Sequence, residues 1–320
     1  MSEISIIGGG AWGTALAAII AHNGTKVTIY AREIDAVDAI NDFHINKPFL
    51  PGITLPKSVK ATITLGDIAE SRIVLVTTPS QFFRTQLKFL REYGVNNEST
   101  FVICTKGIEN DSLALMSDIF EESLSNNYAI LSGPTFAEEV ARGISTSISV
   151  ASKQKGVAET IHSLIERPNF RVHINNDIIG SQICGAVKNV IAIGCGIVRG
   201  LGQGENSKAA ILTNGFHEIM KINKEMGGKI ETLMEPCGIG DLVLTCNSEK
   251  SRNFSFGVAL GQKKSKEELL ANRLSVVEGV ATARSTVALA EKLKLHLPLC
   301  EAINNVIEGK AAPEQILSLV

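Results

Sequence analysis

A single lysine in a long apolar run is the first candidate for chemistry. Between Ile178 and Val198 the only charged side chain is Lys188. The surrounding residues are largely apolar, and the run is predicted to be helical. Burying an ammonium group there is costly unless it points into a cleft or has a partner. Desolvation would lower the pKa of this lysine toward the range useful for proton transfer. The alternative is a helix-edge lysine whose amine reaches solvent. The isolation of Lys188, with Asn189 directly after it, favours the functional role.

Two polar motifs follow in the second half of the chain. Asp241 ends the glycine-rich turn Cys237–Gly240, where helix capping alone would account for an acid. Thr245 lies one helical turn later, so the two side chains could face one site. Ser251–Asn253 places an arginine beside an asparagine, with Ser251 as the expected cap. Forked donors of this kind suit a phosphate, although a solvated loop is an equal alternative.

A glycine motif opens the chain. The strand-like run Ile4–Ile7 leads into Gly8-Gly9-Gly10-Ala11-Trp12-Gly13 and then a helix that we expect to begin near Thr14. In G-x-G-x-x-G the first glycine permits a tight turn, the second lets backbone approach a pyrophosphate, and the third allows close helix–strand packing. The helix N-terminus offers free N–H groups to the anion. A mere tight turn is the alternative, but the flanking elements fall where the motif requires, so the sequence predicts a dinucleotide cofactor.

The residue after the second predicted strand bears on which dinucleotide binds. An acid there would bind the ribose hydroxyls of NAD, but Ala31-Arg32 follows Tyr30. Arginine can meet the 2′-phosphate of NADP and stack on adenine. A solvated Arg32 is the alternative, and Glu33 keeps NAD possible. We therefore expect NADP(H), NAD(H) or both, and favour NADP(H).

Two further turns lie where open α/β sheets bind ligands. Cys104–Gly107 puts Lys106 at the carboxyl end of a predicted strand. Leu131–Glu139 is another strand-to-helix turn, in which Thr135 and Glu138 have capping-box spacing. Alternatively, Gly133 and its adjoining backbone leave room for substrate and nicotinamide.

The elements that must position these groups change character along the chain. The first half alternates β-rich runs with helical segments such as Trp12–His22 and Gln81–Leu90, the pattern of a parallel sheet covered on both faces. After about Asp177 strand signals nearly vanish. We predict a Rossmann-type, doubly wound, mainly parallel α/β domain over residues 1–176 and an all-α substrate and catalytic domain over 177–320. The predicted strands are Ile4–Ile7, Lys26–Tyr30, Ile73–Thr77, Thr100–Cys104, Ala129–Leu131, Ser147–Ala151 and Phe170–His173.

Bulk properties exclude several classes of protein. A chain of 320 residues with a net charge of -2 has no broad cationic surface, so nucleic acid is not its expected ligand. The N-terminus shows neither the basic region nor the cleavage signal of a secretory peptide, so we expect none. We also expect the apolar stretches, which are broken by Gly, Lys or Asn, to be too short for a membrane span. The scattered cysteines have neither C-x-x-C pairs nor zinc spacing, which indicates reduced thiols, no metal and a cytoplasmic protein. They are Cys104, Cys184, Cys195, Cys237, Cys246 and Cys300.

Taken in order, these segments resemble bacterial-type NAD(P)-dependent glycerol-3-phosphate dehydrogenase. The match covers nearly the whole chain, and the order of the pieces makes the joint signal specific. The matching pieces are Gly8–Leu16, Thr105–Ile108, Leu131–Val140, Gly185–Asn189, Gly238–Val243, Thr245–Asn253 and Val276–Val280.

The resemblance implies a reaction and a role for each matching residue. It implies reversible reduction of dihydroxyacetone phosphate to sn-glycerol 3-phosphate, a supply to glycerophospholipid synthesis, and a homodimer. Lys188 would be the proton donor or acceptor. The implied substrate contacts are Lys106, Gly133, Thr135, Asp241, Ser251, Arg252 and Asn253. The implied cofactor contacts are Gly8, Gly10, Ala11, Trp12, Gly13, Arg32, Phe49, Lys106, Ala137, Arg252, Val276 and Glu278.

Some positions depart from the family pattern without removing an implied catalytic group. Asn214 stands where many relatives have arginine, and Glu205 replaces the usual aspartate of Gly-Asp-Asn. Met234–Cys237 replaces a less polar, glycine-containing approach to the Asp241 turn. Two other functions stay open: a related two-domain dehydrogenase of another hydroxy or keto acid, and a catalytically silent NAD(P)-binding sensor.

Overall fold

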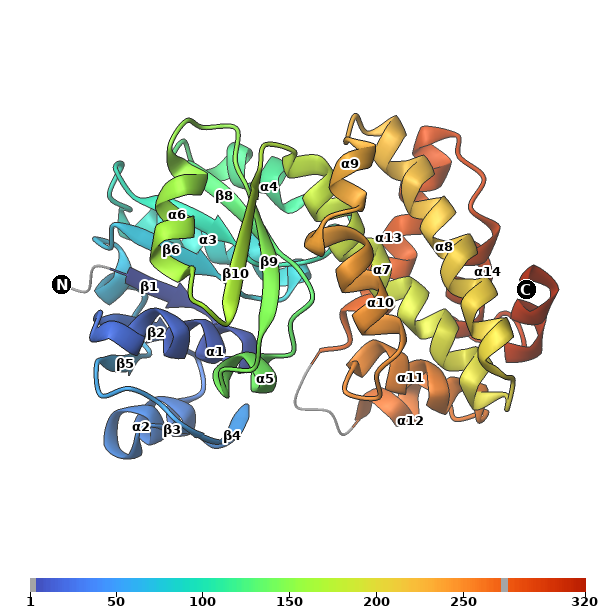
Figure 1. Ribbon diagram of the computed structural model, residues 1–320, viewed down its shortest axis with the longest axis horizontal. Helices are drawn as coiled ribbons and strands as arrows, with labels where there is room; N and C mark the ends of the chain where they lie inside the picture. The colour runs from blue at the N-terminus through green and yellow to red at the C-terminus, as the bar shows by residue number, and fades with distance from the viewer. Residues whose placement is uncertain (1–3, 272–275) are drawn as a thin grey trace. The chain divides into compact units, whose positions relative to one another are not determined.

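The chain packs as two compact units in a computed structural model that describes residues 4–271 and 276–320 (Figure 1). Unit 1 runs to Thr78 and adds Phe82–Thr105 and Met116–Ile178; unit 2 holds Pro79–Gln81, Lys106–Leu115 and Ile179–Val320. The predicted boundary between residues 176 and 177 assigned both early segments of unit 2, Pro79–Gln81 and Lys106–Leu115, to the first domain. The second of these segments begins with Lys106.

Unit 1 is built on an eight-stranded sheet of order β10-β9-β8-β7-β6-β1-β2-β5. Neighbouring strands are parallel except for β8 and β9, which are antiparallel. The predicted Rossmann-type, mainly parallel sheet is therefore confirmed. The strands are β1(Ile4–Ile7), β2(Val27–Tyr30), β5(Val59–Thr62), β6(Ile73–Val76), β7(Thr100–Ile103), β8(Asn127–Ser132), β9(Thr146–Ala151) and β10(Phe170–Asn175).

The central strands were predicted because they are buried on both faces, whereas β5 and the hairpin of β3 and β4 were not predicted. Every residue of β1 is buried, which gives the continuous apolar run typical of parallel sheets. The edge strand β5 instead alternates, with exposed Lys60 between Val59 and Ala61. A small antiparallel hairpin, β3(Ile45–Asn46) and β4(Leu50–Thr54), was also missed because its residues include turn formers.

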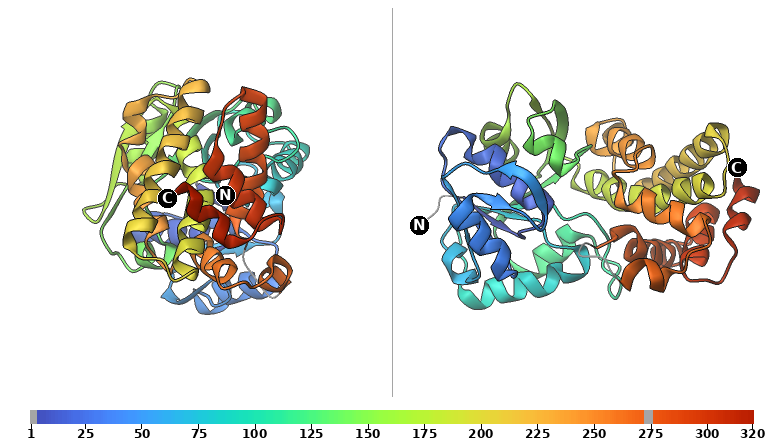
Figure 2. Two further views of the ribbon diagram at one scale, coloured as in Figure 1. Left: turned by 90° about the vertical axis from the view of Figure 1, so that its right-hand side faces the viewer. Right: turned by 90° about the horizontal axis from the view of Figure 1, so that it is seen from below.

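Helices cover both faces of the sheet. Buried residues of α1, α2, α5 and α6 share one core with Ile4, Ile6 and their neighbours. On the other face, ring contacts join Phe120 of α4 to Phe101 of β7 and Tyr128 of β8. The sheet separates the two helix layers, as Figure 2 shows. The helices are α1(Ala11–Ile20), α2(Ile34–Phe43), α3(Phe83–Tyr93), α4(Met116–Ser123), α5(Ala137–Ala141) and α6(Val157–Ile165), with short 3-10 turns η1(Ala21–Asn23), η2(Leu65–Ile68) and η3(Ser80–Phe82).

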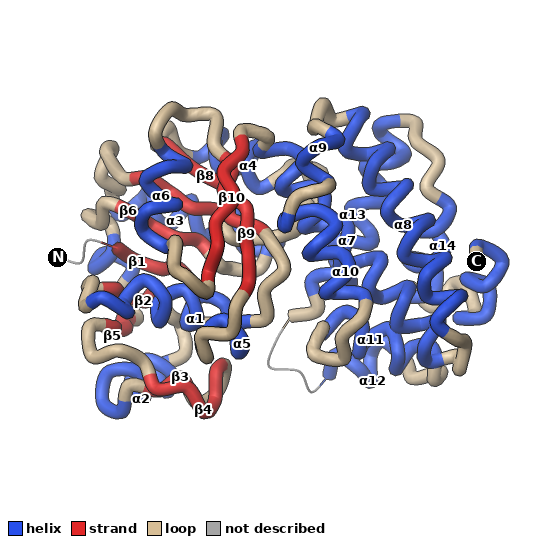
Figure 3. Tube along the Cα trace, viewed as in Figure 1, coloured by secondary structure: helices blue, strands red, loops and turns tan. Residues whose placement is uncertain are grey.

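Unit 2 is helical, which confirms the predicted all-α second domain for the described residues (Figure 3). Its only β-type pairing in that part of the chain is an isolated bridge between Ile108 and Leu115. The helices are α7(Ile178–Gly200), α8(Glu205–Glu225), α9(Ile230–Leu233), α10(Asp241–Cys246), α11(Arg252–Gly261), α12(Lys266–Ala271), α13(Glu278–Leu293) and α14(Pro298–Ile307), with a π-helical turn η4(Pro236–Gly240) and a 3-10 segment η5(Pro313–Leu319).

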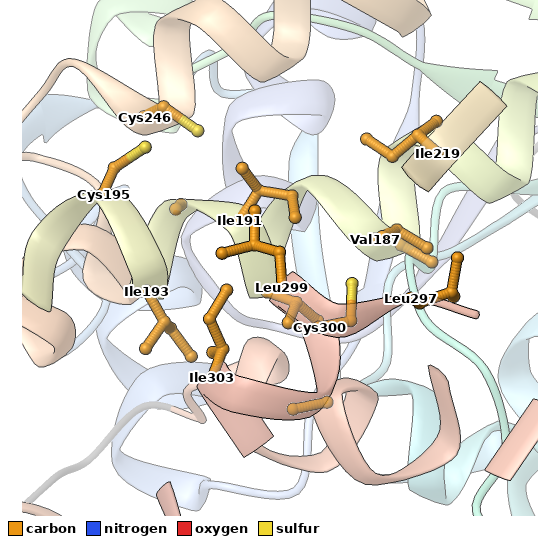
Figure 4. Close-up of a cluster of buried hydrophobic side chains, with 14 of the residues drawn as sticks. Val187, Ile191, Ile193, Cys195, Ile219, Cys246, Leu297, Leu299, Cys300 and Ile303 are labelled. Atoms are coloured by element: carbon orange, nitrogen blue, oxygen red, sulfur yellow. The ribbon is translucent and has the colours of Figure 1, made fainter. Parts of the chain in front are cut away.

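Helix α7 forms the centre of the unit 2 core. Val187, Ile191 and Ile193 of α7 pack with Leu299 and Ile303 of α14 (Figure 4). By length and composition α7 could cross a membrane, so the expectation that the apolar stretches are too short was wrong. However, 94% of its most apolar 18-residue window is buried in the fold. A core helix of a globular domain meets the same criterion, and α7 is packed as one.

A buried carboxylate joins α8 to α14. Glu218 is 4% exposed and accepts hydrogen bonds from the backbone N–H groups of Leu299 (2.7 Å) and Cys300 (2.9 Å). These donors lie in the first turn of α14, where N–H groups have no intrahelical acceptor and a negative charge is favourable. Glu218 therefore supplies from another helix what an N-cap side chain would supply locally.

We expect Glu218→Gln to lower the free energy of unfolding by about 2–3 kcal/mol, because the change removes the charge and leaves one buried N–H without an acceptor. Urea unfolding followed by circular dichroism measures the difference. The control, Glu225→Gln, alters an exposed residue of the same helix and should stay within about 0.5 kcal/mol of wild type. Equal stabilities for both variants would contradict this role of Glu218.

Candidate functional site

The lysine singled out by the sequence is buried and paired. Lys188 lies on α7, is 7% exposed, and donates from Nζ to Asp241 Oδ1 (2.6 Å) and Thr245 Oγ1 (2.8 Å). Both partners come from α10, so the expectation that Asp241 and Thr245 face one site is confirmed. The alternative of a lysine that reaches solvent is excluded in this structure.

A tightly packed turn precedes Asp241 and sets its position. The π-helical turn before α10 contains Gly238 in a non-helical conformation, and a Cβ there would lie 2.1 Å from the carbonyl oxygen of Leu233. Only glycine fits that approach, and π-helical turns often occur at functional sites. Asp241 is the first residue of α10 and makes no capping bond. Its carboxylate, 1% exposed, binds two lysines instead.

Lys106 is the second lysine. Its Nζ lies 2.7 Å from Asp241 Oδ2, so one carboxylate bridges Lys106 and Lys188 through its two oxygens. Lys106 keeps 22% of its side chain exposed. Counted by their formal charges, two cations share one anion, so these three side chains carry one net positive charge. Such a cluster suits an anionic ligand.

Burial tunes the proton affinity of Lys188. Desolvation lowers its pKa from the ordinary 10.5 to about 8, and the Lys106 charge lowers it too, while Asp241 opposes the shift. Thr245 uses its proton on the carbonyl oxygen of Asp241 (2.6 Å), which leaves its lone pairs for Lys188. The amine can therefore both hold and release a proton near neutral pH.

An asparagine pair ties three helices together beside Lys188. Asn253 Nδ2 donates to Asn189 Oδ1 (2.8 Å), and Asn253 Oδ1 accepts from the Gly279 N–H (3.0 Å). Ser251 caps α11 by accepting from the Phe254 N–H, as predicted. Arg252 is exposed on the first turn of that helix. Asn253, predicted at the phosphate, thus joins α7, α11 and α13 in this structure.

Glu278 has a partner that the sequence did not reveal. Its carboxylate accepts from the Ser80 N–H (3.2 Å) and hydroxyl (2.7 Å), a contact that spans 198 residues. Burial raises the pKa of Glu278, while these bonds and the charge of Arg252 act in the opposite direction. Gly107 packs on the same serine, since a Cβ there would lie 2.5 Å from Ser80 Cβ. Val276 lies nearby in the chain and is 44% exposed.

The glycine motif of unit 1 has the geometry that a dinucleotide requires. Gly8 has φ +119°, and a Cβ on Gly13 would lie 2.1 Å from the carbonyl oxygen of Gly8. A Cβ on Gly10 would meet nothing within 4 Å, so that side of the loop is open. Helix α1 begins at Ala11, three residues earlier than predicted, and the N–H groups of its first turn have no intrahelical acceptor. The loop therefore fits a pyrophosphate.

Arg32 and Phe49 take different positions in unit 1. Arg32 is exposed, lies 5.9 Å over the Phe82 ring and is 3.8 Å from Glu33. Phe49 is half-buried in the turn of the β3–β4 hairpin. A guanidinium on an aromatic face leaves its fork available to an anion.

The turn after β8 is packed tightly against β9. Gly133 is buried, and a Cβ there would lie 2.8 Å from Ile148 Cα. Thr135 Oγ1 donates weakly to the Gly133 carbonyl (3.4 Å), and Ala137 is the first residue of α5. The N-cap of α5 is Phe136 without a side-chain cap, so the capping-box explanation of Thr135 and Glu138 does not hold.

The predicted site residues divide between the units. Unit 2 holds the expected proton donor Lys188, the expected substrate contacts Lys106, Asp241, Ser251, Arg252 and Asn253, and the expected cofactor contacts Val276 and Glu278. Unit 1 holds residues expected to contact cofactor or substrate: Gly8, Gly10, Ala11, Trp12, Gly13, Arg32, Phe49, Gly133, Thr135 and Ala137.

The departures from the family pattern have structural partners. Asn214 donates to the Leu319 carbonyl (2.7 Å) and so holds the C-terminal segment η5. Glu205 pairs with Lys208, and Cys237 Sγ lies 3.7 Å from Ser181 Oγ. All six cysteines are buried, and none of them forms a disulfide within the described residues. Residues 4–271 and 276–320 contain no group of three or more His, Cys, Asp or Glu side chains that could hold a metal ion.

Comparison with protein-family models matches both halves of the chain. Residues 3–158 match the N-terminus and residues 177–318 the C-terminus of NAD-dependent glycerol-3-phosphate dehydrogenase. Glycerol-3-phosphate dehydrogenase [NAD(P)+] of Erythrobacter litoralis is 43% identical over 320 residues, which covers 100% of this chain and 96% of that protein. The protein of the same name from Caulobacter vibrioides is 43% identical, over 99% of this chain and 96% of its own length.

Solved structures agree in fold. Glycerol-3-phosphate dehydrogenase of Coxiella burnetii has a TM-score of 0.94 at 33% identity and covers 98% of this chain and 97% of its own. A ketopantoate reductase of Ralstonia eutropha has a TM-score of 0.65 at 14% identity, covering 98% and 99%. The latter shares the fold alone.

We expect Gly10→Ala and Gly13→Ala to fail in different ways. Gly10 has φ -70° and open space around it, so the free energy of unfolding of the alanine variant should stay within about 0.5 kcal/mol of wild type. The same variant should bind NADPH at least about tenfold more weakly. Gly13→Ala should lose about 1–3 kcal/mol of stability, because its Cβ overlaps Gly8. Urea unfolding and NADPH fluorescence titration separate the two effects. Undiminished NADPH binding by Gly10→Ala would remove the pyrophosphate role of the loop.

Proposed function

The chain belongs to the NAD-dependent glycerol-3-phosphate dehydrogenase family, and from that premise we propose that Lys188 moves the proton in its reaction. The reaction is hydride transfer between NAD(P)H and dihydroxyacetone phosphate to give sn-glycerol 3-phosphate, in either direction. The observation that carries the proposal is the buried ammonium of Lys188, held at 2.6 Å by Asp241 with a pKa lowered to about 8.

The chemistry divides between cofactor and protein. A bound reduced nicotinamide supplies the hydride to C2. Lys188 donates a proton to the ketone oxygen as the C–H bond forms, so hydride and proton together convert the carbonyl into a secondary alcohol. In the reverse direction Lys188 accepts the hydroxyl proton. Asp241 and Thr245 hold the amine in place for both directions, because each occupies one of its donor positions.

The remaining site residues have proposed roles in binding. Lys106 and Arg252 balance the phosphate dianion, and their cationic donors suit its oxygens. Ser251, Asn253, Gly133 and Thr135 complete the proposed substrate contacts. The proposed cofactor contacts are Gly8, Gly10, Ala11, Trp12, Gly13, Arg32, Phe49, Lys106, Ala137, Arg252, Val276 and Glu278.

Arg32 supports a preference for NADP(H) over NAD(H). The residue is exposed and rests on Phe82, so its guanidinium is available for a 2′-phosphate. Glu33 beside it is compatible with NAD. The ratio of kcat/KM for NADPH to that for NADH decides the question, and a ratio that Arg32→Ala leaves unchanged would exclude the role of Arg32.

The proposal extends to where and how the protein works. Six cysteines without a disulfide among the described residues support a reducing compartment, hence the cytoplasm. A supply of glycerol 3-phosphate to glycerophospholipid synthesis and a homodimer follow from the family resemblance. Light scattering after size exclusion tests the dimer, and a monomer mass would reject it.

Two other functions are less well supported. The fold also occurs in a ketopantoate reductase, so a dehydrogenase of another hydroxy or keto acid would have this architecture. The excess positive charge of the Lys106–Asp241–Lys188 cluster favours a phosphorylated substrate. Faster turnover of an unphosphorylated ketone would reverse that judgement. A silent sensor would not need Lys188 at this pKa, and tight NADPH binding without turnover would favour it.

We expect Lys188→Met to lower kcat by on the order of 10²–10⁴-fold, because the variant keeps the side-chain length and removes the proton donor. Asp241 retains Lys106 as a partner, so NADPH affinity should stay near wild type. Stopped-flow loss of reduced-nicotinamide absorbance with dihydroxyacetone phosphate measures kcat. The control is Lys221→Met, which changes an exposed lysine that bonds only the His296 carbonyl in the described contacts. Near-normal turnover by Lys188→Met would show that Lys188 is not the proton donor.

The two directions should respond oppositely to pH. Ketone reduction requires protonated Lys188, so its kcat/KM should fall about tenfold per unit above pH about 8. Oxidation of glycerol 3-phosphate requires the neutral amine, so its kcat/KM should rise up to pH about 8 and then level off. Initial rates in both directions across this range provide the test. A break nearer 10.5, the ordinary lysine pKa, would show that burial does not set the titration.

A further inference from the structure

A buried asparagine from another element braces the glycine loop. Asn46 lies in β3, is 1% exposed, and donates from Nδ2 to the Gly9 carbonyl (2.8 Å) and to Thr14 Oγ1 (2.7 Å). These contacts span 37 and 32 residues of sequence. The β3–β4 hairpin thus supplies a polar side chain to the loop from behind.

Thr14 extends the brace to the next carbonyl. Its hydroxyl donates to the Gly10 carbonyl (2.9 Å), and the Gly10 carbonyl also accepts from the Thr14 N–H (3.0 Å). A chain of donors therefore runs from Asn46 Nδ2 through Thr14 Oγ1 to Gly10. Each hydrogen bond in such a chain polarises the next.

The orientation of the Asn46 amide follows from its neighbours. The Gly9 carbonyl can only accept, so the NH₂ group must face the loop. In the described part of the chain, Asn46 Oδ1 is buried without a hydrogen-bond partner. An unsatisfied buried acceptor lowers the stability of the fold. The contribution of Asn46 must therefore come from the two hydrogen bonds that its NH₂ group donates.

Peptide geometry shows what that contribution is. In a trans peptide the C=O and N–H of one unit point in opposite directions. The Gly9 carbonyl shares its peptide unit with the Gly10 N–H, and the Gly10 carbonyl shares its unit with the Ala11 N–H. Holding both carbonyls inward on Asn46 and Thr14 turns both N–H groups outward, to the side of the loop where Gly10 has open space.

We propose that Asn46, acting with Thr14, is a positioning residue that fixes the Gly10 and Ala11 N–H groups toward the pyrophosphate of the cofactor. This inference rests on the proposed cofactor role of the glycine loop. In this role Asn46 acts through the loop backbone, by way of the Gly9 carbonyl and Thr14. It also gives the β3–β4 hairpin a function, since the same hairpin carries Phe49 in its turn.

The experiment measures NADPH dissociation constants by fluorescence titration and the KM–kcat split in the same proteins. Asn46→Ala should raise the Kd and KM for NADPH about 10- to 100-fold, the loss expected when two hydrogen bonds no longer preorganise the loop, with kcat changed less than about threefold. Thr14→Val should act in the same direction, whereas Thr14→Ser keeps the hydroxyl and should bind as wild type.

Asn41→Ala is the matched control. Asn41 also bonds two backbone groups of unit 1, the carbonyl and N–H of Ala61, both at 2.9 Å, from helix α2. Its replacement should lower the Tm of the cofactor-free protein and leave the NADPH Kd unchanged. A merely structural role for Asn46 would make the two alanine variants alike.

The outcomes are distinguishable. Wild-type NADPH affinity in Asn46→Ala, or in Thr14→Val if Asn46→Ala does not fold, overturns the inference alone. An equal loss of affinity in Asn41→Ala also overturns it, because general loosening would then explain the effect. A wild-type protein that binds neither NADPH nor NADH overturns the proposed function and this inference with it.

Discussion

One buried carboxylate shared by two lysines is the interaction on which the rest of this structure depends. Charges as deeply buried as Asp241 and Lys188 are costly to desolvate, and removing one partner leaves the other unpaired. The Lys188–Asp241 pair is therefore weak evidence for stability, and the surrounding apolar core must supply the stability of the fold.

The chain holds this buried pair by placing Lys188 within α7, which is almost wholly buried. It fixes Asp241 through a turn that only glycine allows at position 238. The resulting excess of positive charge and the lowered lysine pKa suit protonation of a ketone on a phosphorylated substrate.

The two units meet different electrostatic problems with different chemical groups. In the proposed mechanism unit 2 uses side-chain charges, because a proton must be moved and a dianion balanced. For its proposed cofactor role unit 1 uses backbone N–H groups, because a glycine-rich loop ahead of a helix lets backbone approach a pyrophosphate closely. Both solutions depend on short contacts that fix the backbone, such as that of Gly13 with the Gly8 carbonyl and that of Gly107 with Ser80. Small shifts of the backbone would misplace the functional atoms, which is why the polar groups behind them matter as much as the groups themselves.

Local pattern predicted much of this, and long-range pairing explains what it missed. A lone lysine in an apolar helix and an Asp–Thr pair one turn apart are signals within a few residues, and both pointed to groups that the fold brings together. The central strands were predictable because burial on both faces leaves a continuous apolar run.

Asn46 and Ser80 gave no such signal, because their hydrogen-bond partners lie 37 and 198 residues away in the sequence. The reading of Asp241 as a possible cap failed because a lysine 135 residues earlier in the chain takes part of its carboxylate. The apolar stretches were expected to be too short for a membrane span, but single Gly, Lys and Asn residues do not end α7, which is packed on all sides.

The titration of Lys188 in the cofactor-free protein tests the central claim most directly. Lysine labelled with ¹³C at Cε reports its protonation by NMR, and the signal of Lys188 is identified by its loss in Lys188→Met. The account predicts a midpoint at pH about 8 in wild type. It also predicts a lower midpoint in Asp241→Asn, because the shared carboxylate favours the charged amine. A wild-type midpoint near the ordinary lysine value of about 10.5 would contradict the account, because Lys188 would then lack the tuned proton affinity on which the proposed mechanism depends.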